Sequence, residues 1–245
     1  MESPAVRCRA FFFSRMMPET RDIQDPRYTA LLPFLSEERI QRFEEVLDHR
    51  TRHLTVVLEN VFQSRNASAV MRSCDGFGLQ DVHLIEDINP WVPNRGVSKG
   101  TNAWLTLHRY RSSTDPTAAC LERLRSKGYR IAVTSPHVNG YDVTELPIDE
   151  PVAVVMGTEW QGVSDRLLAA ADLHVAIPMH GFAESLNISV AAAVVLHELN
   201  RRMRTSDSIS WQLREEEKRE LRAIWAQSSV RNAAGILKRL GVDPG

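Results

Sequence analysis

The chain is poor in cysteine, lacks a long apolar run and carries almost no net charge. Its 245 residues include three cysteines, Cys8, Cys74 and Cys120. They are too few and too scattered for a disulfide framework or a cysteine-based metal site. The longest apolar run, from Val190 to Leu196, falls far short of the ~18 residues that a membrane-spanning helix needs. We therefore expect a cytoplasmic protein with no metal and no membrane segment.

The net charge of −1 arises from 30 Lys and Arg against 31 Asp and Glu. This balance excludes a strongly basic protein that coats nucleic acid unspecifically. The charge is unevenly spread, however: residues 1–53 are neutral, residues 54–200 carry −5 and residues 201–245 carry +4. A basic C-terminal segment on an acidic middle permits local contact with the phosphates of an RNA.

With 43% hydrophobic residues the chain has ample material for a core, which excludes disorder over its whole length. Residues 1–20 show no periodicity, and we expect a disordered extension or a start codon placed upstream of the true one. A targeting peptide would need a clearer apolar core. Residues 21–53 form a predicted helical arm, because Ser36 can cap a helix that carries Ile40, Phe43 and Leu47 at helical spacing.

Residues 54–204 alternate between apolar runs and amphipathic segments. The pattern predicts strands over residues 54–58, 82–85, 104–110, 129–134, 152–156 and 174–177, and helices over 64–77, 117–127, 164–171 and 185–203. Near-continuous apolar strands between helices are typical of a parallel sheet covered on both faces. We therefore expect one α/β domain there. Residues 205–245 begin with a TSDSIS linker and form a predicted C-terminal helical arm, packed on the core or on a second subunit.

The common cofactor motifs are absent. Gly76 and Gly78 have no third glycine at the spacing of a dinucleotide loop, and they end a predicted helix where such a loop would open one. His197 and Glu198 begin an apparent zinc motif, but Arg201 stands where its second histidine would be. The phosphate-binding loop of nucleotide hydrolases and the Gly-x-Ser-x-Gly elbow are also missing.

Three segments place polar residues where a predicted strand meets a helix. They are ENVFQSRNASAVMR (residues 59–72), VMGTEWQGVS (155–164) and IPMHGFAESLNISVA (177–191). The carboxyl ends of parallel strands are where open α/β sheets bind ligands. We therefore expect the functional site to be built from these segments.

Together the three segments resemble the three motifs of the SpoU (TrmH) branch of the SPOUT methyltransferases, in the same order and spacing over roughly residues 54–200. The resemblance implies transfer of a methyl group from S-adenosyl-L-methionine to a ribose 2′-hydroxyl of RNA, by a homodimer. It also implies a deep trefoil knot near the C-terminal end of the sheet, which sequence periodicity does not predict. After the glutamate of the second motif the relatives usually carry Lys-x-Gly, whereas this chain has Trp160, Gln161 and Gly162.

The resemblance also assigns site residues. The catalytic set that it implies, at the RNA substrate, is Asn66, Arg72, Glu159, Ser185 and Asn187. The candidate cofactor contacts are Thr134, Gly157, Ile177, Met179 and Leu186. The flexible, basic stretch from residue 93 to 102 is a candidate RNA contact or an ordinary solvated loop.

The chemistry of these residue types leaves alternatives open. Arg72 is cast as the base in this family, but guanidinium has a pKa above ~12, so a bidentate grip on an RNA phosphate is the easier role. The proton acceptor is then water, the phosphate or Arg72 itself. Asn66 and Ser185 are also suited to capping the helices that follow them, and Asn187 belongs to the first turn of the second of these helices.

The lengths of the two predicted terminal arms favour one class of RNA substrate. Ribosomal-RNA enzymes of this branch commonly carry a compact N-terminal RNA-binding domain, whereas only about 53 residues precede the first predicted strand. Short helical arms at both ends resemble the enzymes that methylate guanosine 18 in the D-loop of tRNA. The alternatives are a different RNA target, either ribosomal RNA or another tRNA position, and a non-catalytic RNA-binding protein that retains the knot.

Overall fold

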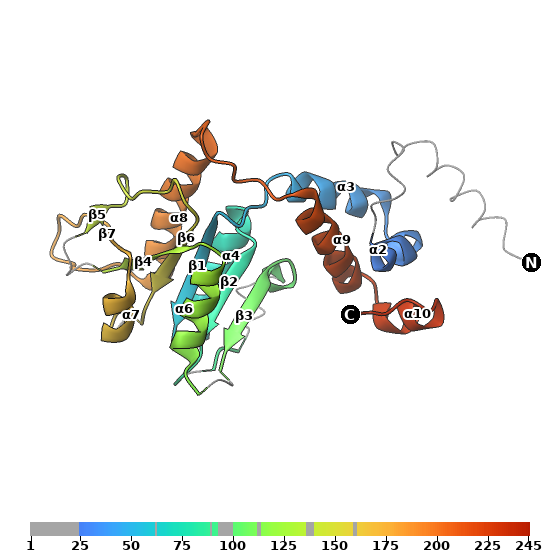
Figure 1. Ribbon diagram of the computed structural model, residues 1–245, viewed down its shortest axis with the longest axis horizontal. Coiled ribbons are helices and arrows are strands. Elements are labelled where there is room, and N and C mark those ends of the chain that lie inside the picture. The colour runs from blue at the N-terminus through green and yellow to red at the C-terminus, as the bar shows by residue number, and fades with distance from the viewer. Residues whose placement is uncertain are drawn as a thin grey trace, which may run out of the picture. The chain divides into compact units, whose positions relative to one another are not determined.

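The computed structural model describes residues 25–61, 63–88, 90–92, 100–111, 114–135, 140–158 and 161–245. These residues form two compact units. One unit comprises residues 49–212, and the other joins residues 25–48 to residues 213–245 (Figure 1). The predicted division into four segments stays a prediction.

The larger unit is built on seven parallel strands, which confirms the predicted parallel sheet. Their order across the sheet is β3-β2-β1-β6-β4-β7-β5. The strands are β1 (Leu54–Glu59), β2 (Asp81–Ile85), β3 (Thr106–Tyr110), β4 (Arg130–Thr134), β5 (Tyr141–Asp142), β6 (Val152–Met156) and β7 (Leu173–Ala176). The two-residue β5 was not predicted, because it is too short to carry a hydrophobic pattern.

Helices cover both faces of the sheet. On one face α4 (Ser64–Gly76) and α8 (Ile188–Thr205) pack on Val56 and Leu58. On the other face α6 (Pro116–Ser126) and α7 (Asp165–Ala170) pack on Val57 and Val155. Successive strand residues point to opposite faces, so strands buried on both sides are apolar at nearly every position. A short 3₁₀ helix, η2 (Thr101–Ala103), precedes β3.

The smaller unit is helical. It contains α2 (Pro26–Leu31), η1 (Leu32–Phe34), α3 (Glu37–Leu47), α9 (Glu215–Ser229) and α10 (Ala233–Arg239). Ser36 caps α3 as predicted, by accepting a hydrogen bond from the Arg39 backbone amide at 3.3 Å. Phe43 and Trp225 pack edge to face with their ring centroids 5.6 Å apart. No helix in the described parts of the chain is long and apolar enough to cross a membrane.

Ion pairs within this helical unit use part of the positive charge of the C-terminal segment. Arg222 binds the Glu44 carboxylate at 2.6 Å and Lys218 binds Asp48 at 2.9 Å. The basic C-terminal segment is therefore partly neutralised by the acidic helix α3. The exposed basic residues of this segment that form no ion pair with the described residues are Arg231, Lys238 and Arg239.

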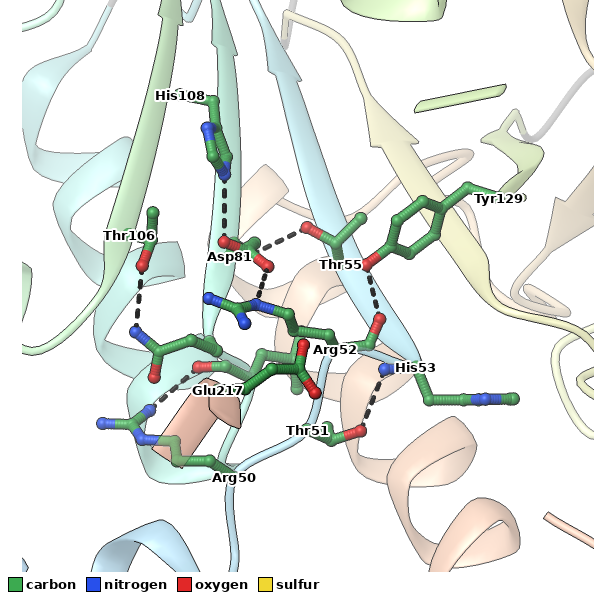
Figure 2. Close-up of polar contacts among 12 residues, drawn as sticks. Arg50, Thr51, Arg52, His53, Thr55, Asp81, Thr106, His108, Tyr129 and Glu217 are labelled. Carbon is green, nitrogen blue, oxygen red and sulfur yellow. Dashed lines mark hydrogen bonds and ion pairs between the residues drawn. The ribbon is translucent and has the colours of Figure 1, made fainter. Parts of the chain in front are cut away.

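A polar cluster lies at the amino ends of the strands, at the opposite edge of the sheet from the three motifs. At its centre the Asp81 carboxylate contacts His108 Nε2 at 2.9 Å and accepts a hydrogen bond from Arg52 Nε at 2.8 Å (Figure 2). Burial raises the pKa of Asp81, but the His108 hydrogen bond and the Arg52 charge outweigh it, so the pKa is lowered. Asp81 is therefore ionised and paired, which is the role of a structural carboxylate.

His83 lies in the same cluster, stacked on His108 with 4.5 Å between ring centroids and with Nδ1 2.8 Å from the Tyr110 hydroxyl. Burial, together with the charge of His108, lowers the pKa of His83 to about 3. The folded state therefore holds His83 neutral over a pH range in which the unfolded chain, with a histidine pKa of ~6.5, takes up a proton. Acid then favours the unfolded state.

We expect the free energy of unfolding to fall as the pH drops below ~6.5, by up to ~1.4 kcal/mol per pH unit from His83 alone. Urea denaturation at pH 6.5, 5.5 and 4.5 measures this slope. The matched variant His83→Phe keeps a ring but cannot titrate, so its stability should depend less steeply on pH by that amount. Equal slopes for the two proteins would show that His83 does not carry the effect.

Candidate functional site

A cavity of about 360 Å³ opens at the carboxyl ends of the strands, beside β4, β6 and β7. The polypeptide that follows each of these strands forms its wall. The lining residues are Thr134, Ser135, Met156, Gly157, Thr158, Gln161, Gly162, Val163, Leu168, Val175, Ala176, Ile177, Met179, Glu184, Ser185, Leu186, Ile188, Ala191 and Val195. Its volume is in the range of small-molecule sites.

One wall is a tight loop after β6. Thr158 and Gly162 exchange two backbone hydrogen bonds, at 2.8 and 2.9 Å, and so close the loop at its base. Gly157 lies directly under this closure: a Cβ atom there would stand 2.0 Å from the Gly162 carbonyl oxygen. Only glycine allows the backbone to approach this closely. The close packing of Gly157 against the Gly162 and Val163 backbone therefore shapes this wall of the cavity.

The opposite wall is the segment between β7 and α8. The side chain of Asn187 caps α8, with Oδ1 accepting from the Ser189 backbone amide at 2.9 Å and from the Ser189 hydroxyl at 2.6 Å. The helix therefore starts at Ile188 rather than at Ser185, and the alternative in which Ser185 caps it is wrong. Ser185 is instead an exposed residue that lines the cavity.

The five predicted cofactor contacts all line this cavity. Thr134 stands at the end of β4, Gly157 follows β6, and Ile177, Met179 and Leu186 follow β7. The Thr134 hydroxyl donates to the Val155 carbonyl at 3.0 Å, which ties β4 to β6 at the rim. The fold thus brings together residues that are up to 52 positions apart, as the sequence motifs lead one to expect.

Two predicted substrate residues lie on α4 and do not line the cavity. Asn66 does not cap this helix: the N-cap is Gln63, and Asn66 Nδ2 is 3.4 Å from Gln63 Oε1. Arg72 lies about 9 Å further along the axis, at a rise of ~1.5 Å per residue. Its side chain is exposed and forms no ion pair or hydrogen bond with the described residues. The capping alternative for Asn66 is therefore wrong, and Arg72 is available to an external anion.

Other predicted features fall outside the described residues. These are Glu159 and Trp160 in the loop after β6, residues 93–99 of the basic stretch, and residues 1–20. Within the described part of the chain no cluster of His, Cys, Asp and Glu is able to hold a metal ion.

The cavity suits a nucleoside that carries a positive charge. Its wall combines the apolar side chains of Met156, Ile177 and Leu186 with hydroxyl and backbone groups. Among the described residues that line it, Glu184 is the only ionisable one, and none is basic. A positively charged ligand would therefore meet no like charge among these lining residues.

Sequence reasoning missed one buried pair beside the cavity. Glu59, the last residue of β1, is 5% exposed and hydrogen-bonds to Ser164, which follows the loop after β6. A carboxylate at the end of an otherwise apolar strand is the signal that could have revealed it, because a buried carboxylate needs a partner.

The sequence model of the SpoU rRNA Methylase family matches residues 53–197. A tRNA (guanosine(18)-2′-O)-methyltransferase of Borreliella burgdorferi is 42% identical over 84% of this chain and 92% of its own length. The crystal structure of the A. aeolicus TrmH/SpoU tRNA modifying enzyme superposes with a TM-score of 0.71, at 31% identity, over 80% of this chain and 98% of that one.

A more distant structure shares the fold alone. The SpoU methyltransferase AviRb from Streptomyces viridochromogenes, in complex with AdoMet, is 23% identical, with a TM-score of 0.52 over 66% of this chain and 62% of that one.

Proposed function

Because the chain belongs to the SpoU methylase family, we propose that it transfers the methyl group of S-adenosyl-L-methionine to the ribose 2′-hydroxyl of guanosine 18 in tRNA. The observation that carries this proposal is the cavity, whose wall includes all five predicted cofactor residues and Ser185. The substrate follows from the relative at 42% identity, which spans nearly the same length. The helical segments before and after the sheet agree with it.

In this proposal one group of residues binds the cofactor and another contacts the ribose. The loop after β6 and the segment from Ile177 to Leu186 would hold the cofactor in the cavity. The cofactor supplies an activated methyl group on sulfur, so the protein needs only to align the hydroxyl with it and to assist departure of the proton. Ser185 lines the cavity wall and Asn187 follows two residues later, and in this proposal both contact the ribose side of the reaction.

Arg72 would bind the RNA phosphate. Its guanidinium is charged at neutral pH and can hold two phosphate oxygens in a fixed geometry. Cα–Cβ bonds of a helix tilt toward its N-terminus, and α4 begins at the carboxyl edge of the sheet, so a long side chain at Arg72 would have reach toward the edge where the cavity opens. This role brings the 2′-hydroxyl into line and leaves the proton to water or to the phosphate. In this proposal Asn66 and Glu159 also act at the substrate.

One alternative has a specific observation behind it: the matching family model is described as an rRNA methylase family. A ribosomal RNA substrate would use the same cavity and the same arginine. The deciding property is then which RNA accepts the methyl group.

We expect a tRNA transcript with guanosine 18 to take up label from S-adenosyl-L-methionine carrying a labelled methyl group. A matched transcript with 2′-deoxyguanosine at that position should take up none, because it lacks only the accepting hydroxyl. Mass spectrometry of the digested RNA locates the modified nucleotide. Equal labelling of the two transcripts would refute guanosine 18 as the target, and labelling of ribosomal RNA alone would favour the alternative. Binding of tRNA without any methyl transfer would indicate the non-catalytic protein.

We also propose the deep trefoil knot, the homodimer and the cytoplasmic location. The knot is supported by β7, which follows both β4 and β5 in the chain yet lies between them in the sheet. The dimer is supported by three exposed apolar side chains of the larger unit, Phe182, Val190 and Val194. A crystal structure that traces residues 130–205, the molar mass in solution and cell fractionation, respectively, test the three proposals.

A further inference from the structure

Glu59 is a buried carboxylate at the centre of the sheet that does not itself reach the cavity. It ends β1, which lies between β2 and β6, and it is 5% exposed. It is not among the residues that line the cavity. Burying a carboxylate is costly unless its oxygens accept hydrogen bonds. The hydrogen-bond donors that contact Glu59 therefore indicate which part of the structure its side chain stabilises.

Both oxygens of Glu59 bind the same residue. Oε2 accepts from the Ser164 backbone amide at 2.8 Å, and Oε1 accepts from the Ser164 hydroxyl at 2.6 Å. The same hydroxyl accepts from the Leu167 amide at 3.4 Å and caps α7. Glu59 thus fixes the residue at which the loop after β6 ends and the helix begins.

That loop is one wall of the cavity. It is anchored upstream by β6 and closed at its base by the bonds between Thr158 and Gly162. Gly157, Gly162 and Val163 all line the cavity. On the downstream side, Ser164 follows Val163 directly, so the carboxylate of Glu59 sets where this wall stands.

The backbone beside Glu59 connects it to the first motif. Asn60 has a φ of 47°, in the left-handed region that asparagine tolerates better than most residues. Its amide donates to the Ile85 carbonyl at 2.9 Å, and its Oδ1 accepts from the Ile88 amide at 2.9 Å. The turn after β1 is therefore fixed on the side of β2, while the Glu59 side chain holds the loop on the side of β6.

We propose that Glu59 is a positioning residue for the cofactor: its two hydrogen bonds to Ser164 hold the loop after β6 where it forms the cavity wall. This inference rests on the proposed function, because the ligand of the cavity is the S-adenosyl-L-methionine assigned there.

The test compares two substitutions of nearly equal length. Glu59→Met removes both acceptors, whereas Glu59→Gln keeps an acceptor for the Ser164 amide and offers an N–H to the Ser164 hydroxyl. We expect Glu59→Met to raise the Kd for S-adenosyl-L-methionine at least about tenfold, and Glu59→Gln to stay within about threefold of wild type. Isothermal titration calorimetry of the full chain measures both, and the affinity for tRNA should be unchanged.

Glu86 provides the matched control. It is 6% exposed, follows β2 and is held by Arg109 at 2.5 Å and by the Trp91 amide at 2.6 Å, and none of its hydrogen bonds with described residues reaches the loop after β6. Glu86→Met should lower the melting temperature while leaving the cofactor Kd within about threefold of wild type. A rise in Kd as large as that of Glu59→Met would mean that general destabilisation is responsible, and it would overturn the proposal.

A second variant covers the case in which Glu59→Met does not fold. Ser164→Ala removes the hydroxyl contact to Glu59 together with the cap of α7, keeps the contact of the Ser164 amide, and should raise the cofactor Kd about three- to fivefold. An unchanged Kd for Ser164→Ala, or for Glu59→Met, would overturn the role of Glu59 while wild-type binding still supports the proposed function. Wild-type protein that binds no S-adenosyl-L-methionine would overturn the proposed function, and the role of Glu59 with it.

Discussion

Arg72→Ala should lower the rate of methyl transfer by about 10²–10³-fold, as removal of a preorganised group that stabilises developing charge does in other enzymes. Arg72 is exposed on α4 and lies outside the cavity, so the Kd for S-adenosyl-L-methionine should stay at the wild-type value. Single-turnover assays with saturating tRNA measure the rate, and calorimetry measures the cofactor affinity. Arg72→Lys should recover little, because an ammonium cannot grip two phosphate oxygens in the same fixed geometry.

Arg123→Ala is the control for loss of positive charge alone. Arg123 is likewise an exposed helical arginine, but it lies on α6, which covers the opposite face of the sheet. Surface substitutions usually change the free energy of unfolding by no more than ~0.5 kcal/mol, so the variant should stay folded. Its rate of methyl transfer should therefore stay within about twofold of wild type. If Arg72→Ala abolishes cofactor binding, Arg72 belongs to the cavity and its assignment to the RNA phosphate is wrong.

Gly157→Ala should raise the Kd for S-adenosyl-L-methionine by about 100-fold or more, which corresponds to ~2.7 kcal/mol. The added Cβ would stand 2.0 Å from the Gly162 carbonyl oxygen and 2.3 Å from the Val163 nitrogen, both of them backbone atoms. Carbon atoms pack at ~3.5–4.0 Å, so the loop would have to move by more than about 1 Å. Calorimetry measures the affinity, and circular dichroism shows whether the variant is folded.

Gly181→Ala is the matched control in the segment that forms the opposite wall. A Cβ there would find its nearest neighbour, the Ala183 nitrogen, at 4.0 Å, which is an ordinary contact. The cofactor Kd should therefore stay within about threefold of wild type. If Gly157→Ala bound S-adenosyl-L-methionine as tightly as wild type, the loop would be able to move at little cost in free energy. The close approach of the backbone at Gly157 would then not be what shapes the cavity.

Much of the larger unit could be predicted because its signals are local. The strand predicted over residues 152–156 coincides with β6, since a short run of successive apolar residues is typical of a strand buried on both faces of a parallel sheet. The cofactor residues were placed by motifs at strand ends, and the structure collects all five around one cavity. The start of α8 was predicted three residues early, because serine and asparagine both cap helices and only the fold shows that Asn187 does so.

Other features depend on partners that are distant in the chain. Ser164 is 105 residues from Glu59, and no periodicity connects them. Arg222 and Glu44 are 178 residues apart, so the charge that made the C-terminal segment look basic is partly cancelled by a helix near the other end of the chain. A sequence pattern can indicate that a buried carboxylate requires hydrogen-bond donors. It does not indicate which distant residues of the chain provide those donors.

The sequence by itself determined the parallel sheet, the three polar motifs at the strand ends and, through them, the methylase family. Apolar periodicity and motif spacing are properties of short segments, so they can be recognised without knowing the path of the chain in three dimensions. The tertiary structure decided the order β4-β7-β5, which sets the loop after β6 and the segment after β7 on opposite walls of one cavity. It also decided that Glu59 holds one of those walls, because only the folded path brings the end of β1 beside Ser164.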